Sequence, residues 1–572
     1  MLNQYAAPFI LFLFWKVMIL SVRNKHGFLY GSAVLMLSMA AVKLFGALFK
    51  IPLAALLRET GMGYFTSAYT VYTAVYALAV SGLSTATARM TSSCLSEGKA
   101  AGRILKASML LFLGIGVTGS AAAALLARPF SEWMGSPQTM WSVLALSPAI
   151  LFCCIMAAFR GYYEGCSDMR PTAVVQVIEA ASKAACGLLF AYLAIQKGLQ
   201  DFSAGERVYG AVCSSKEAAV QAVIPFASAA AMLGVTLSTA LGSVYLFFFH
   251  KKQPHRKAGN TPYRKICREL LHTAAPIALS AAVMQLSAMI DTVTIQHQLQ
   301  AALISEGSAL SYRVYLAQGE SLSAFLYGAF MSCMTLFHIV PAFSAVFGKS
   351  ALPGITAAWT AGKEHELSTQ VTRALKITVL MAGPMAFGLA AVAKPVLKLL
   401  YPALPGMQAV GSSILPVLAV ASFFFAFLAP YQAVMQGIGR ADLPLKAVLC
   451  GAAVKLLANL TLVRLPAFHI MGAAVGTLLC YLTIALFALI SLKRTLPAAV
   501  SLTGVLIKPL LCAILSAFSA FLVQKALTNN LSDSIIAIVS IAVGAAVYVT
   551  ALFLFRIVRR SDFSFVRKHK NT

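Results

Sequence analysis

Long runs of apolar residues, separated by short polar connectors, dominate the pattern along this chain. An apolar run of 18 or more residues is long enough to cross the hydrocarbon core of a bilayer as a helix. A window of about 19 residues predicts about fourteen such helices. Their expected ranges are 28–50, 68–88, 104–127, 139–159, 172–195, 220–249, 270–296, 321–347, 371–393, 411–438, 446–463, 470–491, 501–523 and 535–557. The pattern therefore predicts an all-α polytopic membrane protein.

The composition supports the same class. The 572 residues are 59% hydrophobic and only 11% charged, and the mean hydropathy is +0.81. A soluble domain needs about 25% charged residues to cover its surface, so an ordinary soluble enzyme is excluded. The sequence shows no GxxxxGK[ST] motif and no set of nucleophile, base and oxyanion donors. We therefore expect that the chain is not an enzyme and that any transport runs on an ion gradient or the membrane potential.

The charge of the chain is strongly basic. Lys and Arg number 45 against 18 Asp and Glu, a formal net charge of +27. In a soluble protein this would suggest nucleic acid as a partner, but membrane proteins retain Lys and Arg in loops on the cytoplasmic side. With the predicted helices, roughly thirty basic residues fall on one side and about eleven on the other. This asymmetry predicts that both termini are cytoplasmic, and nucleic acid is not expected to bind.

The cysteines do not point to a metal or to disulfides. None of the eleven forms a CxxC pair or a Cys/His cluster with metal-ligand spacing. Several lie inside apolar runs, where a free thiol behaves as a small hydrophobic group. No metal and no bound cofactor are expected.

The predicted helices divide the chain into two lobes. The longest charged connector is "HKKQPHRKAGNTPYRKICRE" at 250–269, close to mid-chain, and such a connector is expected as a hinge between two bundles. The expected parts are an N-terminal segment at 1–27, an N-lobe of six helices at 28–249, the basic cytoplasmic linker at 250–269, a C-lobe of six helices at 270–491, two further helices at 492–557 and a basic cytoplasmic tail at 558–572. The N-terminal segment is too short for a comfortable span, and an interfacial helix and a misread start both remain open.

A weak internal repeat agrees with this division. The segment at 164–189 resembles the segment at 436–461, and a single offset aligns Gly165 with Gly437 and Lys183 with Lys455. Each segment reads as a loop that follows one helix and leads into a helix with a buried lysine. Many secondary transporters consist of two structurally related halves with a site between them.

Charged residues inside the apolar runs are the most informative residues of the chain. A charge at mid-bilayer costs at least about 2.5 kcal/mol unless it faces a wet cavity or a partner. The charges of this kind are Lys43, Glu179, Lys183, Asp291 and Lys455. We interpret Lys43 and Lys455 as facing a cavity, because neither has an acidic neighbour close by on its own helix.

Alternatives remain open for three of these positions. Glu179 and Lys183 are spaced i, i+4, so mutual neutralisation explains them as well as a functional role does. Lys50 follows Lys43 by two helical turns on nearly the same face, and snorkelling to the membrane surface is the simpler interpretation of it. Asp291 fits a coupling cation or proton, a cavity lysine, or the cap of a broken helix.

Several segments resemble one protein family. They are "KLFGALFKIPLAALLRETGMGYF" at 43–65, "SGLSTATAR" at 81–89, "RGYYEGCSDMRPTAVVQVIEAASKA" at 160–184 and "LYGAFMSCMTLFHIVPAFSAVFGKSALPGI" at 326–355. Together they resemble the stage V sporulation protein B group of the multidrug/oligosaccharidyl-lipid/polysaccharide (MOP) exporter superfamily, beside the MurJ-type lipid II flippases. The resemblance implies fourteen helices, arranged as two six-helix lobes and two C-terminal helices.

The resemblance also implies functional residues. Its most specific piece is an arginine-glycine-tyrosine loop and the segment after it, represented here by Arg160, Gly161, Tyr162, Glu164, Pro171, Gln176 and Glu179. Lys43 and Lys50 match cavity cations of the MurJ-type relatives, and Asp291 matches an acidic residue of the seventh helix. Ser84 departs from the family pattern, which has proline there.

These observations lead to one functional hypothesis and two alternatives. The first is a flippase that moves an undecaprenyl-diphosphate-linked saccharide across the bacterial cytoplasmic membrane by alternating access. Lys43, Lys50, Lys183 and Lys455 would bind the diphosphate, since an ammonium suits phosphate. Coupling to Na+, H+ or the membrane potential, with Asp291 as the candidate residue, stays open, as does contact with other cell-envelope synthesis proteins. The alternatives are a cation-coupled multidrug antiporter of the same superfamily, and an envelope or sporulation scaffold without transport.

Overall fold

The structure of the chain is a computed structural model. It describes residues 28–77, 82–96, 101–134, 136–166, 168–251, 262–304, 322–344, 361–440, 442–465, 467–496, 502–528 and 531–555, together with the single positions 314, 355, 358, 359 and 557. The expected N-terminal segment at 1–27, most of the basic linker and the expected basic tail lie outside the described residues. So do the side chains of Lys43 and Asp291, whose backbones are helical.

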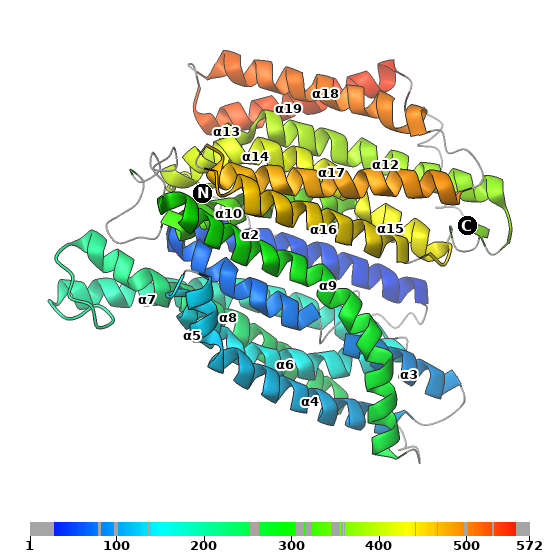
Figure 1. Ribbon diagram of the computed structural model, residues 1–572, viewed down its shortest axis with the longest axis horizontal. Helices are drawn as coiled ribbons and strands as arrows, with labels where there is room; N and C mark the ends of the chain where they lie inside the picture. The colour runs from blue at the N-terminus through cyan, green and yellow to red at the C-terminus, as the bar shows by residue number, and fades with distance from the viewer. Residues whose placement is uncertain are drawn as a thin grey trace. The chain divides into compact units, whose positions relative to one another are not determined.

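The described part of the chain is predominantly helical, as the sequence predicts, and its connections include an isolated β-bridge between Val208 and Ala211 (Figure 1). Contacts group the chain into two compact units. Unit 1 comprises residues 1–300 and 316–328, and unit 2 comprises residues 301–315 and 329–572. Helix α10 (Leu322–Phe337) crosses the boundary between them.

Unit 1 contains the helices α2 (Phe28–Ala77), α3 (Thr85–Ser96), α4 (Gly102–Leu125), α5 (Ala127–Trp133), α6 (Thr139–Gly165), α7 (Arg170–Ser203), α8 (Lys216–Lys251) and most of α9 (Tyr263–Ile304). Helix α6 packs against α4 and α8, and α7 packs against α8 and α2. Buried apolar side chains such as Phe112, Met156 and Phe159 form a core within the unit. Helix α8 therefore packs against both α6 and α7, while α6 and α7 meet each other only near their connection.

Unit 2 contains the helices α12 (Glu364–Ala391), α13 (Ala393–Leu400), α14 (Pro405–Ala426), α15 (Leu428–Gly437), α16 (Asp442–Leu462), α17 (His469–Thr495), α18 (Leu502–Leu527) and α19 (Asp533–Leu554). Helix α17 packs against α16 and α14, while α18 packs against α12 and α19. The Tyr548 hydroxyl of α19 donates to the backbone oxygen of Leu380 in α12 at 2.9 Å, which ties the last helix to the unit.

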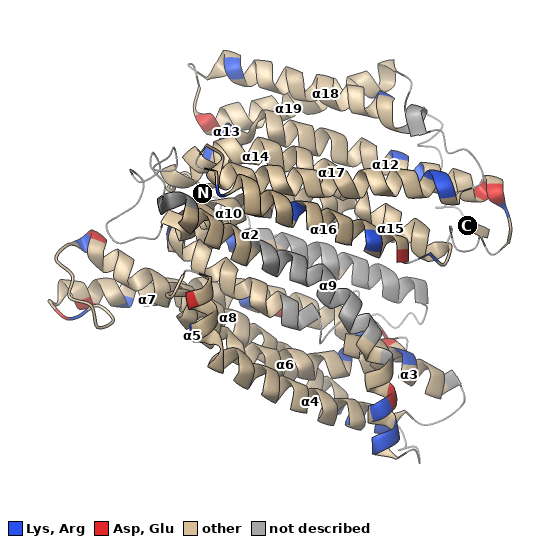
Figure 2. Cartoon of the chain, in the orientation of Figure 1, with Lys and Arg blue, Asp and Glu red and all other residues tan. Residues whose placement is uncertain are grey.

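Eleven helices in the described residues are long and apolar enough to cross a membrane. They coincide with eleven of the predicted ranges. Charged side chains concentrate towards the helix ends and are sparse along the helix middles (Figure 2). The chain is therefore a multi-pass membrane protein, and the total of fourteen spans stays a prediction.

Helix α2 differs from its prediction because it contains two helices joined at a break. Arg58 has a φ of 56° and a ψ of −171° inside α2, so the helical hydrogen bonding is interrupted there. The expected span at 28–50 lies before the break. The expected span at 68–88 is shifted, since helix occupies the chain from the break to Ala77 and α3 begins at Thr85.

The first part of the expected C-lobe groups with unit 1. Two buried hydrogen bonds give the physical reason: Gln296 of α9 donates to the Ser67 hydroxyl of α2 at 2.7 Å, and Tyr327 of α10 donates to Thr292 of α9 at 2.9 Å. The contacts therefore divide the chain near Gln300, whereas the sequence analysis divides it at the linker. The two lobes of six helices remain a prediction.

Candidate functional site

The motif residues lie where α6 ends and α7 begins. The predicted loop at Arg160 to Glu164 is wrong, because these residues form the last turns of α6, which continues to Gly165. Only residues 166–169 connect the two helices. Pro171 occupies the first turn of α7, where a missing backbone N–H costs no hydrogen bond.

Helix α6 continues through the predicted loop, and two glycines in this part let it lie directly on α3. A Cβ at Gly161 would lie 2.5 Å from the backbone oxygen of Ser84, and a Cβ at Gly165 would lie 2.5 Å from that of Ala88. Neither distance leaves room for a side chain. Small residues four apart allow close helix contact in membranes, so the role of the motif glycines is packing.

Polar side chains of the motif fasten α7 to its neighbours. The Thr172 hydroxyl donates to Glu164 at 3.2 Å and joins the two ends of the connection. The Ser38 hydroxyl of α2 donates to the amide oxygen of Gln176 at 3.3 Å. These contacts set the position of α7 relative to α2 and α6.

Aromatic residues surround the end of α6. Tyr162 is buried, and its ring lies 5.5 Å from that of Tyr163. The Tyr163 hydroxyl lies 3.0 Å from Nδ1 of His250, the residue before the end of α8. Sequence analysis selected Tyr162 but missed Tyr163 and His250, since only the fold brings α8 to this end of α6.

The acidic motif residues share a buried cation. Arg160 is only 5% exposed, and it interacts electrostatically with both Glu164 and Glu179. A buried charge is stable only with such compensation. Arg160, Glu164 and Glu179 are thus one electrostatic group, formed by the last turns of α6 and the first half of α7.

The i, i+4 spacing of Glu179 and Lys183 suggests an ion pair, but the closest contact of Lys183 is with Tyr69. Its Nζ lies 3.4 Å from the hydroxyl oxygen of Tyr69 in α2, and 5.5 Å from the centre of the same ring. Within the described residues no ion pair joins Lys183 to Glu179, although the two interact at longer range. The ammonium is therefore held mainly by an aromatic ring and a phenol, in a cation–π arrangement.

Tyr69 belongs to a row of aromatic side chains along α2. The ring centres of Phe49 and Phe65 are 5.8 Å apart, those of Phe65 and Tyr69 are 5.9 Å apart, and those of Tyr69 and Tyr72 are 5.7 Å apart. The row fixes the ring that supports Lys183. Sequence analysis missed Tyr69 because its partner lies on a helix more than a hundred residues away.

Lys43 and Lys50 lie on the part of α2 before the break at Arg58. The stretch is continuous helix, so their spacing of seven residues places them on nearly the same face. Lys50 is half-buried. The side chains of Lys43 and Asp291 lie outside the described residues, so the roles predicted for them stay predictions.

Lys455 is a buried cation of unit 2. It is 6% exposed and lies inside α16. Lys455 follows Asp442, the first residue of α16, by the same number of residues as Lys183 follows Arg170, the first residue of α7. The proposed repeat therefore has the same helical layout in both units. The described residues contain no group of His, Cys, Asp and Glu that could hold a metal ion.

Comparisons with known proteins find two matching family models and several similar proteins. The family model for polysaccharide biosynthesis proteins matches residues 28–199, and the MatE family model matches residues 320–461. The first matched range includes Lys183 and the second includes Lys455. The chain is 24% identical to lipid II flippase MurJ of Bacillus subtilis (strain 168), over 95% of this chain and 99% of that protein. It is 22% identical to stage V sporulation protein B of the same organism, over 94% and 97%.

Solved structures show the same fold. An inward closed conformation of lipid II flippase MurJ superposes with a TM-score of 0.66, at 16% identity, over 92% of this chain and all of that one. In sequence and in fold, this chain is therefore similar to MurJ and to the MatE proteins of the MOP exporter superfamily. An inward-facing MATE family transporter of the same superfamily gives a TM-score of 0.61 at 15% identity, over 80% of this chain. At these identities the solved structures establish the fold alone.

Proposed function

We propose that this MurJ-like chain is a flippase for an undecaprenyl-diphosphate-linked saccharide, with lipid II or a related polysaccharide precursor as substrate. The observation that carries the proposal is the environment of Lys183. Its closest contacts are the Tyr69 ring and hydroxyl, neither of which has a full negative charge, while Glu179 interacts with it only at longer range. Such a cation keeps its attraction for a phosphate group.

The other members of the proposed site are Lys43, Lys50 and Lys455. The headgroup of the substrate is too polar to cross hydrocarbon unaided, so the protein must supply a wet passage lined by charge. The diphosphate would bind to these lysines while the prenyl tail stays in the lipid. Alternating access of the passage to the two membrane faces would then complete the transfer.

The remaining parts of the proposal follow from the charge distribution. Retention of basic loops on one side gives cytoplasmic termini in a bacterial cytoplasmic membrane. Asp291, on α9, is the candidate for coupling to Na+ or H+, and the membrane potential is the other energy source. The lipid bilayer and the lipid-linked saccharide are the proposed partners.

The test uses cells depleted of their own lipid II flippase that express this chain. We expect survival and outward exposure of lipid II, without ethidium efflux from the same culture. Efflux without rescue would support the multidrug antiporter and reject the flippase. Absence of both signals would reject lipid II as the substrate and leave another lipid-linked saccharide to be tested in the same way.

Variants of α7 connect the assay to the site. Lys183→Gln removes the charge but keeps a similar length, so we expect at least a tenfold loss of lipid II exposure; Lys183→Arg should retain part of it. Lys197→Gln is the matched control, since Lys197 lies on the same helix but is exposed. Equal exposure of lipid II in Lys183→Gln and wild type, at equal membrane level, would remove Lys183 from the proposal.

A further inference from the structure

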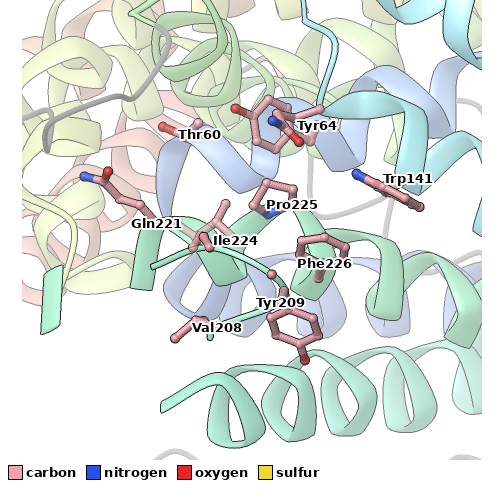
Figure 3. A pocket seen from close by; sticks show the side chains of 13 residues that line it. Thr60, Tyr64, Trp141, Val208, Tyr209, Gln221, Ile224, Pro225 and Phe226 are labelled. Carbon is pink, nitrogen blue, oxygen red and sulfur yellow. The ribbon is translucent and has the colours of Figure 1, made fainter. Parts of the chain in front are cut away.

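A pocket of about 440 Å³ lies wholly within unit 1 (Figure 3). The beginnings of α6 and α8, the part of α2 after its break and the loop between α7 and α8 form its walls. This is the end of α6 and α8 opposite to the Tyr163–His250 contact. None of the residues proposed above to bind the diphosphate lines the pocket.

One wall is a tight β-hairpin at 208–211. Backbone hydrogen bonds of 2.9 Å run in both directions between Val208 and Ala211. Tyr209 and Gly210, the two residues between them, have φ values of 48° and 90°. Positive φ at both positions is the type I′ geometry of two-residue hairpins. Glycine adopts it freely, but for tyrosine it is an uncommon conformation that surrounding contacts must hold.

Two contacts hold Tyr209 in this conformation. Its hydroxyl donates to the backbone oxygen of Ala194 in α7 at 3.0 Å. Its ring stacks on Phe226 of α8, with ring centres 4.5 Å apart and planes only 10° from parallel. The strained tyrosine is therefore fixed as a rigid part of the pocket wall.

A third aromatic ring extends this wall. Trp141 of α6 lies 5.4 Å from Phe226, measured between ring centres, and it is 39% exposed. The close-up shows Trp141, Phe226 and Tyr209 on one side, with Thr60 and Gln221 on the other (Figure 3). Aromatic rings of this kind can pack against the C–H faces of a sugar ring.

The polar groups of the pocket are uncharged. Gln138, Gln221 and Thr60 contribute amides and a hydroxyl. Thr60 is 2% exposed, and its Oγ1 has no hydrogen-bond partner among the described residues. A buried hydroxyl without a partner is uncommon and calls for an explanation. A ligand hydroxyl in the pocket would supply the missing hydrogen bond.

The described lining contains no Asp, Glu, Lys, Arg or His. An organic cation would find aromatic faces here but no carboxylate, and a phosphate would lack a cation. A saccharide needs neither, because aromatic faces with a few amides and hydroxyls satisfy both its C–H and its O–H groups. The volume lies within the range of about 300–1,000 Å³ that is typical of small-molecule pockets.

We infer that this pocket binds an uncharged saccharide unit. The further step, that the pocket lies on the extracytoplasmic side and holds the sugar of the translocated substrate, rests on the proposed function and topology. Binding of a saccharide in the pocket is independent of them, because it requires only the chemistry of the lining residues. The site thus separates recognition of the sugar, by Trp141, Phe226 and Thr60, from recognition of the diphosphate by lysines.

The test uses the purified full chain in lipid nanodiscs, with N,N′-diacetylchitobiose as the soluble probe and saturation-transfer NMR as the readout. We expect specific binding to the wild type. Trp141→Ala should weaken it at least fivefold, and Thr60→Val, which removes only the hydroxyl, about threefold. Trp133→Ala is the matched control, since Trp133 is a more exposed tryptophan at the end of α5 that does not line the pocket.

Three outcomes would overturn the inference. They are no binding of the probe to the wild type, binding to both pocket variants that is as strong as binding to the wild type, and displacement of the probe by tetraphenylphosphonium. The result is distinguishable from failure of the proposed function. Sugar binding without lipid II translocation would reject lipid II as the substrate but keep the saccharide pocket. Translocation without sugar binding would reject the pocket alone.

Discussion

The α6–α7 pair of unit 1 and the α15–α16 pair of unit 2 have the same layout but different charges. In both, a helix ends in a glycine, Gly165 or Gly437, and the next helix carries a lysine at the same position, half-buried in α7 and buried in α16. In α7 the lysine is preceded by Glu179 one turn earlier. The offset of the repeat places Gly451 at that position in α16, where a Cβ would lie 2.6 Å from Ile484.

This difference indicates which feature both repeats share. The acid is present in one repeat and replaced by a packing glycine in the other, whereas the lysine is present in both. The one acidic residue of α16 is Asp442, at its first turn, where it pairs with Lys446 at 3.0 Å. A positive charge within the span is therefore the common chemistry, as expected of a site that binds an anion.

The variant expected to have the largest effect is Lys455→Gln. The charge of Lys455 is 6% exposed inside α16, and its removal should abolish lipid II exposure in depleted cells while membrane insertion persists. Lys446→Gln is the control on the same helix, because Lys446 is exposed and pairs with Asp442. If Lys455→Gln exposes lipid II as the wild type does, the lysines of the two repeats do not share a function.

The next variant tests the packing that is observed for the first repeat. Gly165→Ala would place a methyl group against Ala88 and Thr91 of α3. Overpacking of this kind costs about 1–3 kcal/mol, so the melting temperature in detergent should fall. Gly114→Ala on α4 is the control, since a Cβ there meets nothing within 4 Å. Equal melting temperatures for the two variants would contradict the close contact of α6 with α3.

The smallest effect is expected for Tyr69→Phe. It removes the 3.4 Å contact with Lys183 but keeps the ring below the ammonium. A hydrogen bond to a charged group contributes about 1.5–3 kcal/mol at most, and this one is long. We expect a two- to threefold fall in lipid II exposure, measured beside Lys183→Gln. A loss as large as that of Lys183→Gln would show that the phenol, and not the ammonium, is the essential group.

Hydropathy predicted much of the fold because each span needs a long apolar run. The eleven observed candidate spans follow from this rule, and so does the position of Lys183 and Lys455 within helices. The motif at Arg160 to Glu164 was mistaken for a loop, because polar residues and glycines usually mark a turn. Here the glycines instead allow contact between helices.

Contacts between distant segments could not be predicted in the same way. No local pattern connects Lys183 to Tyr69, or Tyr163 to His250, since each pair meets only through packing of separate helices. The hairpin at Tyr209 was also missed. Tyrosine followed by glycine does not by itself indicate a turn with positive φ at both positions, and the bridge between Val208 and Ala211 appears only in the fold.

The most direct test of the account is the affinity of the purified chain for lipid II in nanodiscs. It should be measured for the wild type and for Lys183→Gln, Lys455→Gln and the control Lys197→Gln. We predict at least a tenfold loss for Lys183→Gln and for Lys455→Gln, equivalent to about 1.4 kcal/mol, and no change for Lys197→Gln. Equal affinity in all four proteins would contradict the claim that the lysines of the two repeats bind the diphosphate.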